Sequence, residues 1–175
     1  MKDFEKFFED MPSNSLSAVI AVAMDMNASY NKLVTKHLPK AQIVYDRFHM
    51  QSQFGRDVLG VVRLDEARRH KAKEKEILAD ISNDTDKETM KSLKQEAKTE
   101  KQKYSQLKKL RWPLLINSNK LSDSKTEQLQ SIQQDHHDLA VCYAMKEEMC
   151  RLYELTDYQQ AVIGWTKWFQ AAKES

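Results

Sequence analysis

Two apolar segments near the N-terminus each end in an aspartate. Residues 16–24 (LSAVIAVAM) precede Asp25, and residues 41–45 (AQIVY) precede Asp46. If the two segments are neighbouring parallel strands, both carboxylates lie at one edge of the sheet, and their mutual repulsion raises the pKa of one of them. An aspartyl nucleophile at Asp25 is disfavoured, because Asn27 stands where the second aspartate of a D-x-D pair is required. Paired carboxylates at a strand edge are therefore the main chemical feature of the chain.

The segments around these aspartates predict a β-α-β unit. Residues 16–24 are expected to form a strand that is covered on both faces, and residues 41–45 form a second, shorter strand. Residues 27–38 have helical periodicity and end at Pro39, so the two strands are connected by a crossover helix and pair in parallel. A short helix over residues 2–11 precedes them and is broken by residues 12–15.

Each polar residue of this region also has a structural explanation. Asp25 at the end of a strand can cap the helix that follows, and Asp46 can cap a helix that starts at Arg47. His49 lies one helical turn after Asp46 and is expected to be packed or hydrogen-bonded to a neighbour rather than catalytic.

The rest of the chain is expected to be helical. Residues 48–81 predict one long helix, residues 82–84 a turn, and Thr85 with Glu88 a capping box. The next helix has the 3-4 spacing of a coiled-coil seam, which indicates a long helical hairpin. The residues of this seam are Met90, Leu93, Ala97, Glu100, Tyr104 and Leu107.

The C-terminal third predicts three more helices. Ser124 and Glu127 form a second expected capping box, and residues 137–155 form an amphipathic helix. The last helix carries a wide aromatic face that includes Trp165 and Trp168, and this face is expected to be buried. The adjacent pair of histidines at 136–137 lacks a matching second pair of ligands, so no metal is expected there.

The composition limits the fold class and the compartment. The chain has 175 residues, enough for one domain or for one core with an appendage, and only 3 glycines and 3 prolines, which argues against an all-β fold. The formal net charge is +2, and no apolar run approaches the roughly 20 residues of a membrane span. Two cysteines do not make a disulfide framework. We therefore expect a predominantly helical α/β protein, soluble, reduced and cytoplasmic.

Five segments carry a resemblance to a known family in their order along the chain. They are VAMDMNASY, HLPKAQIVYDRFHM, VVRLDEARRH, LRWPLLINSNKLSDSKTEQLQ and AVIGWTKWFQAAKES. Together they resemble insertion-sequence transposases of the DDE type, in the ISL-type subgroup whose RNase H-like catalytic domain is interrupted by a long helical insertion. The resemblance implies that residues 1–50 are part of the RNase H-like domain and residues 51–175 belong to the helical insertion.

The resemblance implies a metal-binding role for Asp25. In this family an aspartate at the corresponding strand end is the second of three carboxylates that hold two Mg²⁺ or Mn²⁺ ions, and these ions support phosphoryl transfer on DNA. Asp25 is therefore the candidate catalytic and metal-binding residue, and Asp46 is a second candidate close to the metal.

The chain departs from the family pattern in two places. The first aspartate of the family precedes the part present here, and the glutamate follows it in an S-N-G-x-x-E-G-like segment that Glu174 does not match. We therefore expect a central fragment that is catalytically incomplete and binds no cation by itself. The alternative is a non-catalytic remnant that binds DNA or forms dimers, with itself or with a full-length transposase, away from any membrane.

Basic residues in the hairpin are candidates for contacts with DNA. They are Arg63, Arg68, Arg69, Lys71 and Lys73. In a transposase they would contact the phosphate backbone of the transposon ends, without reading the base sequence. The alternative is a solvated helical face, because acidic residues are interleaved with them.

Overall fold

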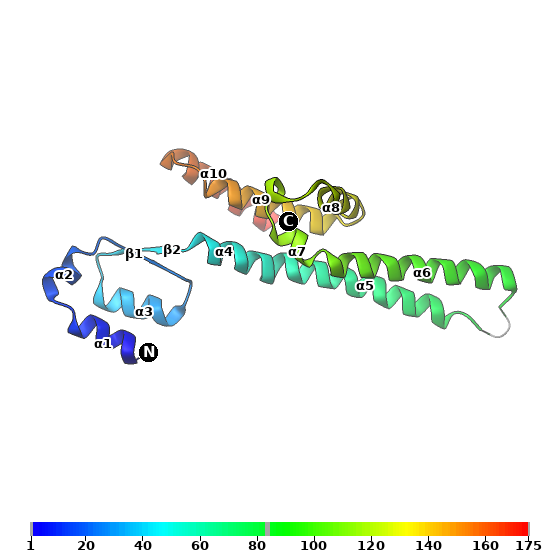
Figure 1. Cartoon of the computed structure of the whole chain (residues 1–175), viewed down its shortest axis with the longest axis horizontal. Coiled ribbons are helices and arrows are strands. Elements are labelled where there is room, and N and C mark those ends of the chain that lie inside the picture. The colour runs from blue at the N-terminus through cyan, green and yellow to red at the C-terminus, as the bar shows by residue number, and fades with distance from the viewer. Residues whose placement is uncertain (1, 83–84, 175) are drawn as a thin grey trace. The chain divides into compact units, whose positions relative to one another are not determined.

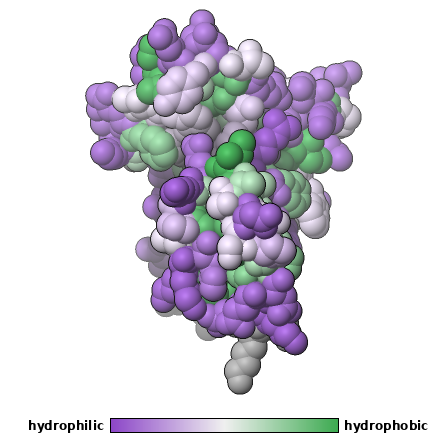
Figure 2. Space-filling model, turned by 90° about the vertical axis from the view of Figure 1, so that its left-hand side faces the viewer, coloured by the Kyte–Doolittle hydropathy of each residue, from purple (hydrophilic) through white to green (hydrophobic). Residues whose placement is uncertain are grey.

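The structure is a computed structural model that describes residues 2–82 and 85–174, and Figure 1 shows its elements. The chain divides into two compact units, Met1–Ser52 and Gln53–Ser175. The described part is predominantly helical, with one small parallel sheet, as predicted. No helix among the described residues is long and apolar enough to cross a membrane. The surface in Figure 2 is mostly hydrophilic, with scattered hydrophobic patches.

The N-terminal unit is built around a β-α-β element, as the sequence predicted. Its elements are α1 (Lys2–Asp10), α2 (Ser13–Ala18), β1 (Ala21–Met24), α3 (Ala28–His37), β2 (Gln42–Tyr45) and most of α4 (Arg47–Phe54). The two strands pair in parallel, with Ala21 opposite Gln42 and Met24 opposite Tyr45. A small core lies between α1, α3 and one face of the sheet, and it consists of Phe8, Leu33, Val34 and Leu38.

The first strand is shorter and more exposed than predicted. Residues 16–18 belong to α2, which begins directly after Pro12, where the backbone N–H groups of Ser15 and Leu16 donate to the Pro12 carbonyl. Only alternate residues of β1, Val22 and Met24, pack toward the core, while the residues between them are exposed. The prediction of a strand covered on both faces is therefore wrong, because the helices of this unit cover one face only.

The helical unit begins with the predicted hairpin. A π-helical turn, Gly55–Leu59, connects α4 to α5 (Gly60–Ala79), and α6 (Lys87–Lys109) runs back along α5. Gly55 lies close to the end of the Leu115 side chain, which would have to move to make room for a Cβ atom at this position. Ala97, Glu100 and Leu107 of the predicted seam are buried. The predicted turn over residues 82–84 lies partly outside the described residues.

The remaining helices pack at the base of the hairpin. They are α7 (Arg111–Leu115), a 3₁₀ turn (Ser118–Lys120), α8 (Asp123–Asp135), α9 (His137–Leu152) and α10 (Tyr158–Glu174). The core that they form with α5 and α6 includes Leu59, Leu107, Leu110, Leu114, Leu129 and Leu139.

Two predicted capping boxes are wrong. The side chain of Asp86, and not that of Thr85, accepts hydrogen bonds at the start of α6, from the backbone N–H groups of Glu88 and Thr89 at 2.9 Å each. Helix α8 begins after Ser122 without a side-chain cap. The cap positions lie one residue after the predicted cap in α6 and two residues before it in α8, because a small shift in the helix start moves the cap with it.

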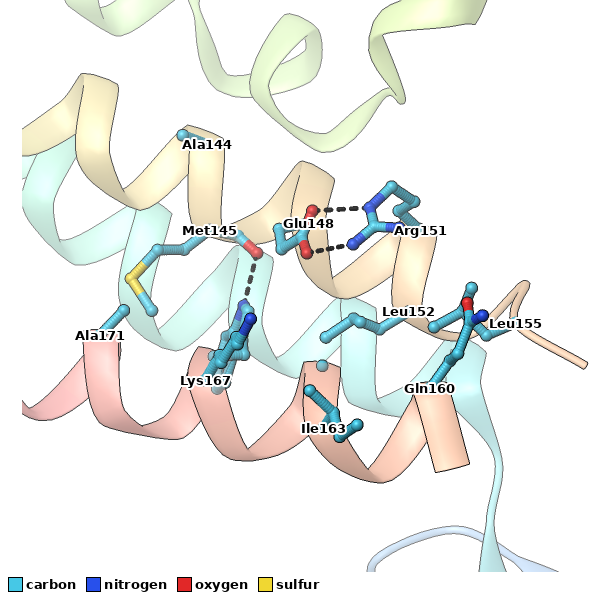
Figure 3. A pocket seen from close by; sticks show the side chains of 12 residues that line it. Ala144, Met145, Glu148, Arg151, Leu152, Leu155, Gln160, Ile163, Lys167 and Ala171 are labelled. Carbon is cyan, nitrogen blue, oxygen red and sulfur yellow. Dashed lines mark hydrogen bonds and ion pairs between the residues drawn. The ribbon is translucent and has the colours of Figure 1, made fainter. Parts of the chain in front are cut away.

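The aromatic face of α10 is not buried as predicted. No residue of α10 is buried, and Tyr158 and Phe169 are 82% and 56% exposed. Trp168 is half-buried and its indole N–H donates to the Met145 carbonyl oxygen at 2.8 Å. A groove of about 540 Å³ lies between α9 and α10 beside this contact. Leu152 and Ile163 line it, as Figure 3 shows. Helix α10 packs on α9 along one side, so the rest of its aromatic face stays in solvent.

Candidate functional site

The carboxyl ends of β1 and β2 bring Asp25 and Asp46 to the same edge of the sheet. Met24 is paired with Tyr45, and the backbone N–H of Asp46 donates to the Met24 carbonyl at 2.9 Å. Asp25 and Asp46 are each the next residue of their strand, so the parallel register continues to both of them. The structure thus places Asp25 and Asp46, which the sequence analysis singled out, at the same edge of the sheet.

Asp25 has a carboxylate oxygen without a hydrogen-bond partner. Its Oδ1 is shielded from solvent and accepts no hydrogen bond from any described residue. The helix that follows is capped by Asn27 instead, whose Oδ1 accepts from the N–H groups of Ser29 at 2.9 Å and Tyr30 at 3.3 Å. The alternative role of Asp25 as the cap of this helix is therefore excluded. A shielded carboxylate oxygen without a partner is costly unless a cation or another donor reaches it.

Asp46 is held by its own helix. Its Oδ1 accepts from the backbone N–H of Phe48 at 2.8 Å, and its Oδ2 lies 3.1 Å from Nδ1 of His49. The hydrogen bond from Phe48, followed by that from His49, lowers the pKa of Asp46, so the group stays ionised. Asp46 therefore caps α4, and His49 is the hydrogen-bonded neighbour that the sequence analysis expected.

Asp25 and Asp46 are not joined by a third ligand in the described part of the chain. Across residues 2–82 and 85–174, one group of three histidine, cysteine or acidic side chains has its ligand atoms within 4.8 Å of one another, namely Glu66, His70 and His136 in the helical unit. The edge at Asp25 fits a divalent cation through oxygen ligands, since a carboxylate oxygen is free of hydrogen bonds there.

The five basic residues proposed for DNA contacts differ in their surroundings. Arg63 is buried, and its guanidinium donates to the carbonyl oxygens of Leu107 at 3.2 Å and Lys108 at 3.4 Å. Burial lowers the pKa of Arg63, with a further contribution from Arg111. These hydrogen bonds connect α5 to the end of α6. Because its side chain is buried, Arg63 is not available for a contact with phosphate. We therefore remove it from the candidate set.

Of the other four basic residues of this set, three are exposed and Lys71 is half-buried, and all four are paired with acids. Nη1 of Arg68 lies 2.7 Å from Asp65, Nη1 of Arg69 lies 2.6 Å from Glu66, and Nζ of Lys71 lies 2.7 Å from Glu74. Nζ of Lys73 lies 3.5 Å from Glu100 and 3.8 Å from Glu96. A neighbouring carboxylate weakens the attraction of each cation for phosphate.

A second set of basic residues, on α6, was not singled out in the sequence. Lys87, Lys91, Lys94 and Lys98 are exposed and line a shallow groove of about 440 Å³ with Met90 and Gln95. Their spacing of three and four residues puts them on one side of the helix, adjacent to the seam. No described acidic residue lies within ion-pair distance of these four lysines. The alternation of charges along the sequence hid this stripe, which the helical periodicity alone could have revealed.

The chain is 28% identical over 169 residues to a protein of Bordetella parapertussis described as the transposase for insertion sequence element IS1001. The family model for DDE transposases of the ISL3 group, described as "Transposase", matches residues 1–175. The chain therefore belongs to the ISL3 group of DDE transposases.

The alignment covers 97% of this chain and 35% of the Bordetella protein. The chain thus spans about a third of the length of the curated relative that it matches. No solved structure matches it.

Proposed function

We propose that this chain contributes one metal-holding carboxylate and a DNA-backbone surface to a transposase that cuts and joins DNA. The observation that carries the proposal is the shielded Oδ1 of Asp25, which has no partner among the described residues, at the end of β1 beside Asp46. In a member of the DDE family, a carboxylate in this position is suited to a divalent cation. Functional sites often keep polar groups that the fold leaves unsatisfied.

Asp25 would hold the cation, and Asp46 would position the edge of the sheet. When bound, Mg²⁺ or Mn²⁺ supplies charge stabilisation for the phosphoryl transfer and activates the attacking oxygen. Asp25 is the better ligand of the two, because both oxygens of Asp46 already accept hydrogen bonds from α4. The remaining carboxylates of the family triad are expected outside these residues, and the catalytic incompleteness of this chain stays a prediction.

Paramagnetic broadening by Mn²⁺ tests the role of Asp25 without requiring activity. Against the expectation that the fragment by itself binds no cation, the proposal requires at least weak binding at Asp25. An excess of Mn²⁺ is therefore expected to broaden the amide signals of residues 24–26 and 46–48 first in NMR spectra of the chain. Asp25→Asn removes this broadening, whereas Asp57→Asn, at an exposed carboxylate paired with Arg56, leaves it unchanged. If the edge is not broadened, or is broadened equally in Asp25→Asn, the assignment of Asp25 is wrong.

The DNA-backbone surface is assigned to the four lysines of α6, with the paired residues Arg68, Arg69, Lys71 and Lys73 as a weaker neighbouring face. Lys87 and Lys98 are 11 residues apart, which is roughly 16 Å along a helix at 1.5 Å per residue. That length matches several successive phosphates of a DNA strand, and unpaired lysines are attracted to phosphate without sequence preference.

Binding to a DNA duplex of random sequence tests this surface. Lys91→Gln/Lys94→Gln/Lys98→Gln is expected to weaken binding and to reduce the slope of log K against log salt by about 3, since each lost phosphate contact contributes roughly 0.9. The matched control Arg68→Gln/Arg69→Gln changes two paired cations and is expected to have a smaller effect. If both variants have the same effect, or none, the α6 surface is not the DNA contact.

Self-association is the second candidate function, and the short sheet favours it. Within the described residues the sheet has two strands, so each strand has an unpaired edge. Pairing with a second copy or with a longer transposase would satisfy these edges. Light scattering is expected to give a dimer that a proline at the free edge of β1, Ala23→Pro, dissociates, because Gln42 and Asp46 donate to Ile20 and Met24 and the N–H of Ala23 therefore faces away from β2. A monomer at all concentrations rejects this candidate.

A further inference from the structure

A buried group of metal-ligating side chains lies in the helical unit, separate from the carboxylates of the sheet. Glu66 and His70 are four residues apart on α5, and His136 stands immediately before α9. One ligand atom of each side chain lies within 4.8 Å of the others. The side chains of Glu66, His70 and His136 are 14%, 16% and 6% exposed. The fold brings this group together from positions up to 70 residues apart in the chain.

We propose that Glu66, His70 and His136 bind a zinc-type transition-metal dication. Two imidazole nitrogens and one carboxylate oxygen are a ligand set that zinc favours, whereas Mg²⁺ favours oxygen ligands alone. The spacing i, i+4 directs Glu66 and His70 to the same side of α5. His136 comes from a different element, so a bound cation would join the start of α9 to the middle of α5.

The surroundings orient the ligands as in protein zinc sites. Nδ1 of His70 lies 2.5 Å from Oε2 of Glu100 on α6, which leaves Nε2 of this ring for a metal. Nη1 of Arg69 donates to Oε1 of Glu66 at 2.6 Å, which leaves Oε2 toward the histidines. A carboxylate behind a histidine ligand fixes the ring and raises its basicity.

Without a cation, the same side chains form a compact hydrogen-bonded contact. Nδ1 of His136 lies 3.1 Å from Oε2 of Glu66, and the rings of His70 and His136 meet edge to face with centroids 5.1 Å apart. A cation would replace the contact between His136 and Glu66 with two metal bonds. This hydrogen-bonded contact without metal is the competing explanation, and the experiment must distinguish the two.

Zinc content and thermal stability test the proposal directly. The full chain, purified without a polyhistidine tag, is expected to retain about one zinc per chain, measured by elemental mass spectrometry. Removal of the zinc lowers the melting temperature detected by tryptophan fluorescence, and Zn²⁺ restores it while Mg²⁺ does not. Cobalt in place of zinc gives the intense visible bands of a four-coordinate site with nitrogen ligands. If the chain binds neither zinc nor cobalt, the proposal is wrong and the three side chains form a hydrogen-bonded contact only.

Matched variants locate the site. His70→Gln and His136→Gln are expected to lose zinc binding, while His137→Gln, at the exposed neighbour of His136, retains it. Glu100→Gln, which keeps the ligands, weakens binding roughly 10–100-fold, as loss of a supporting carboxylate does. Lys73→Gln removes only the cation that pairs with Glu100 and leaves zinc binding unchanged.

Circular dichroism establishes that each variant is folded. If a variant does not fold, the cobalt spectrum of the unaltered chain still tests whether the chain binds a metal. Zinc binding that survives both His70→Gln and His136→Gln would overturn the assignment of these ligands.

Discussion

Two groups of side chains that we propose as metal ligands differ in their donors and in their burial. Asp25 and Asp46 offer only oxygen at the end of a two-stranded sheet, and one oxygen of Asp25 has no hydrogen-bond partner in the described chain. Glu66, His70 and His136 offer nitrogen and oxygen between helices, and all three have hydrogen-bond partners.

On the two proposals, the edge at Asp25 is a site for chemistry and the group of Glu66, His70 and His136 is a site for stability. An oxygen edge with a free acceptor leaves coordination positions for water and substrate, as a site for phosphoryl transfer requires. A buried group of imidazole and carboxylate joins elements that are distant in sequence, and binding there adds to folding free energy. We therefore expect changes in the helical unit to alter stability and changes at Asp25 to alter metal binding with little effect on stability.

The largest expected effect is a loss of stability confined to the helical unit. Leu107 is fully buried between the hairpin helices, and Leu107→Ala is expected to lower the free energy of unfolding by about 2–5 kcal/mol. All three tryptophans, at 112, 165 and 168, belong to this unit, so denaturation followed by tryptophan fluorescence measures it selectively.

NMR signals of Val34 in the N-terminal unit serve as the control, and Leu107→Ala is expected to leave their unfolding transition unchanged. A joint shift of both transitions would mean that the two units unfold together and that the comparison between them fails.

The sequence predicted the elements that rest on local periodicity. The helix 28–37, the strand 42–45 and the hairpin seam were predicted correctly, because their apolar residues repeat with the period of the element. The group of Glu66, His70 and His136 was not predicted, since it depends on packing between α5 and the start of α9. Its one visible sign was Glu100, a charged residue in an apolar seam, which the structure pairs with His70.

Burial was predicted less well than secondary structure. The apolar run before Asp25 and the aromatic face of α10 were both expected to be covered, and both are partly exposed. Composition shows that a surface is apolar but not which element covers it, and this chain spans about a third of the relative's length. The predicted role of Asp25 rests on the family resemblance, because hydrophobic periodicity contains no information about catalytic residues.

A half-buried carboxylate of the helical unit provides the second prediction. Glu147 accepts two hydrogen bonds from Ser118, from N–H at 3.1 Å and from O–H at 2.5 Å, and it lies 2.6 Å from Nζ of Lys146. Glu147→Gln is expected to cost about 1–2 kcal/mol, an amount that allows for screening by water. Chemical denaturation followed by tryptophan fluorescence measures it, and a cost below the error of the method would contradict it.

The pKa of Glu147 also predicts how the free energy of unfolding falls at acidic pH. Burial raises the pKa of Glu147, but the hydrogen bonds from Lys146 and Ser118 lower it more, so the folded pKa lies below the ordinary value of 4.5. A depressed pKa contributes stability that is complete above pH 4.5 and is lost as the pH falls through the folded pKa. Tyr143 on the same helix also faces this carboxylate. In Glu147→Gln the loss of stability with acid is expected to be shallower, and an unchanged slope would reject this source.

The third prediction concerns the cap next to the candidate site. Asn27 accepts two backbone hydrogen bonds at the start of α3, so Asn27→Ala is expected to destabilise the N-terminal unit by about 1 kcal/mol. Asn27→Ser keeps a capping oxygen and is the matched control. Amide hydrogen exchange in α3 measures the effect, which should be absent from the helical unit. Equal protection in Asn27→Ala and Asn27→Ser would mean that the side chain does not stabilise this helix.

The smallest expected effect on stability lies two residues away, at Asp25. Asn27 has its acceptor satisfied, whereas Oδ1 of Asp25 is shielded and receives no hydrogen bond from the described residues. Asp25→Asn removes a charge that the fold does not compensate, so the free energy of unfolding should change by less than about 0.5 kcal/mol or rise. Amide exchange in β1 and β2 measures this, with Asn27→Ala as the contrasting variant. A substantial loss of stability in Asp25→Asn would show that the carboxylate stabilises the fold, and its position at the strand end would then need no cation to explain it.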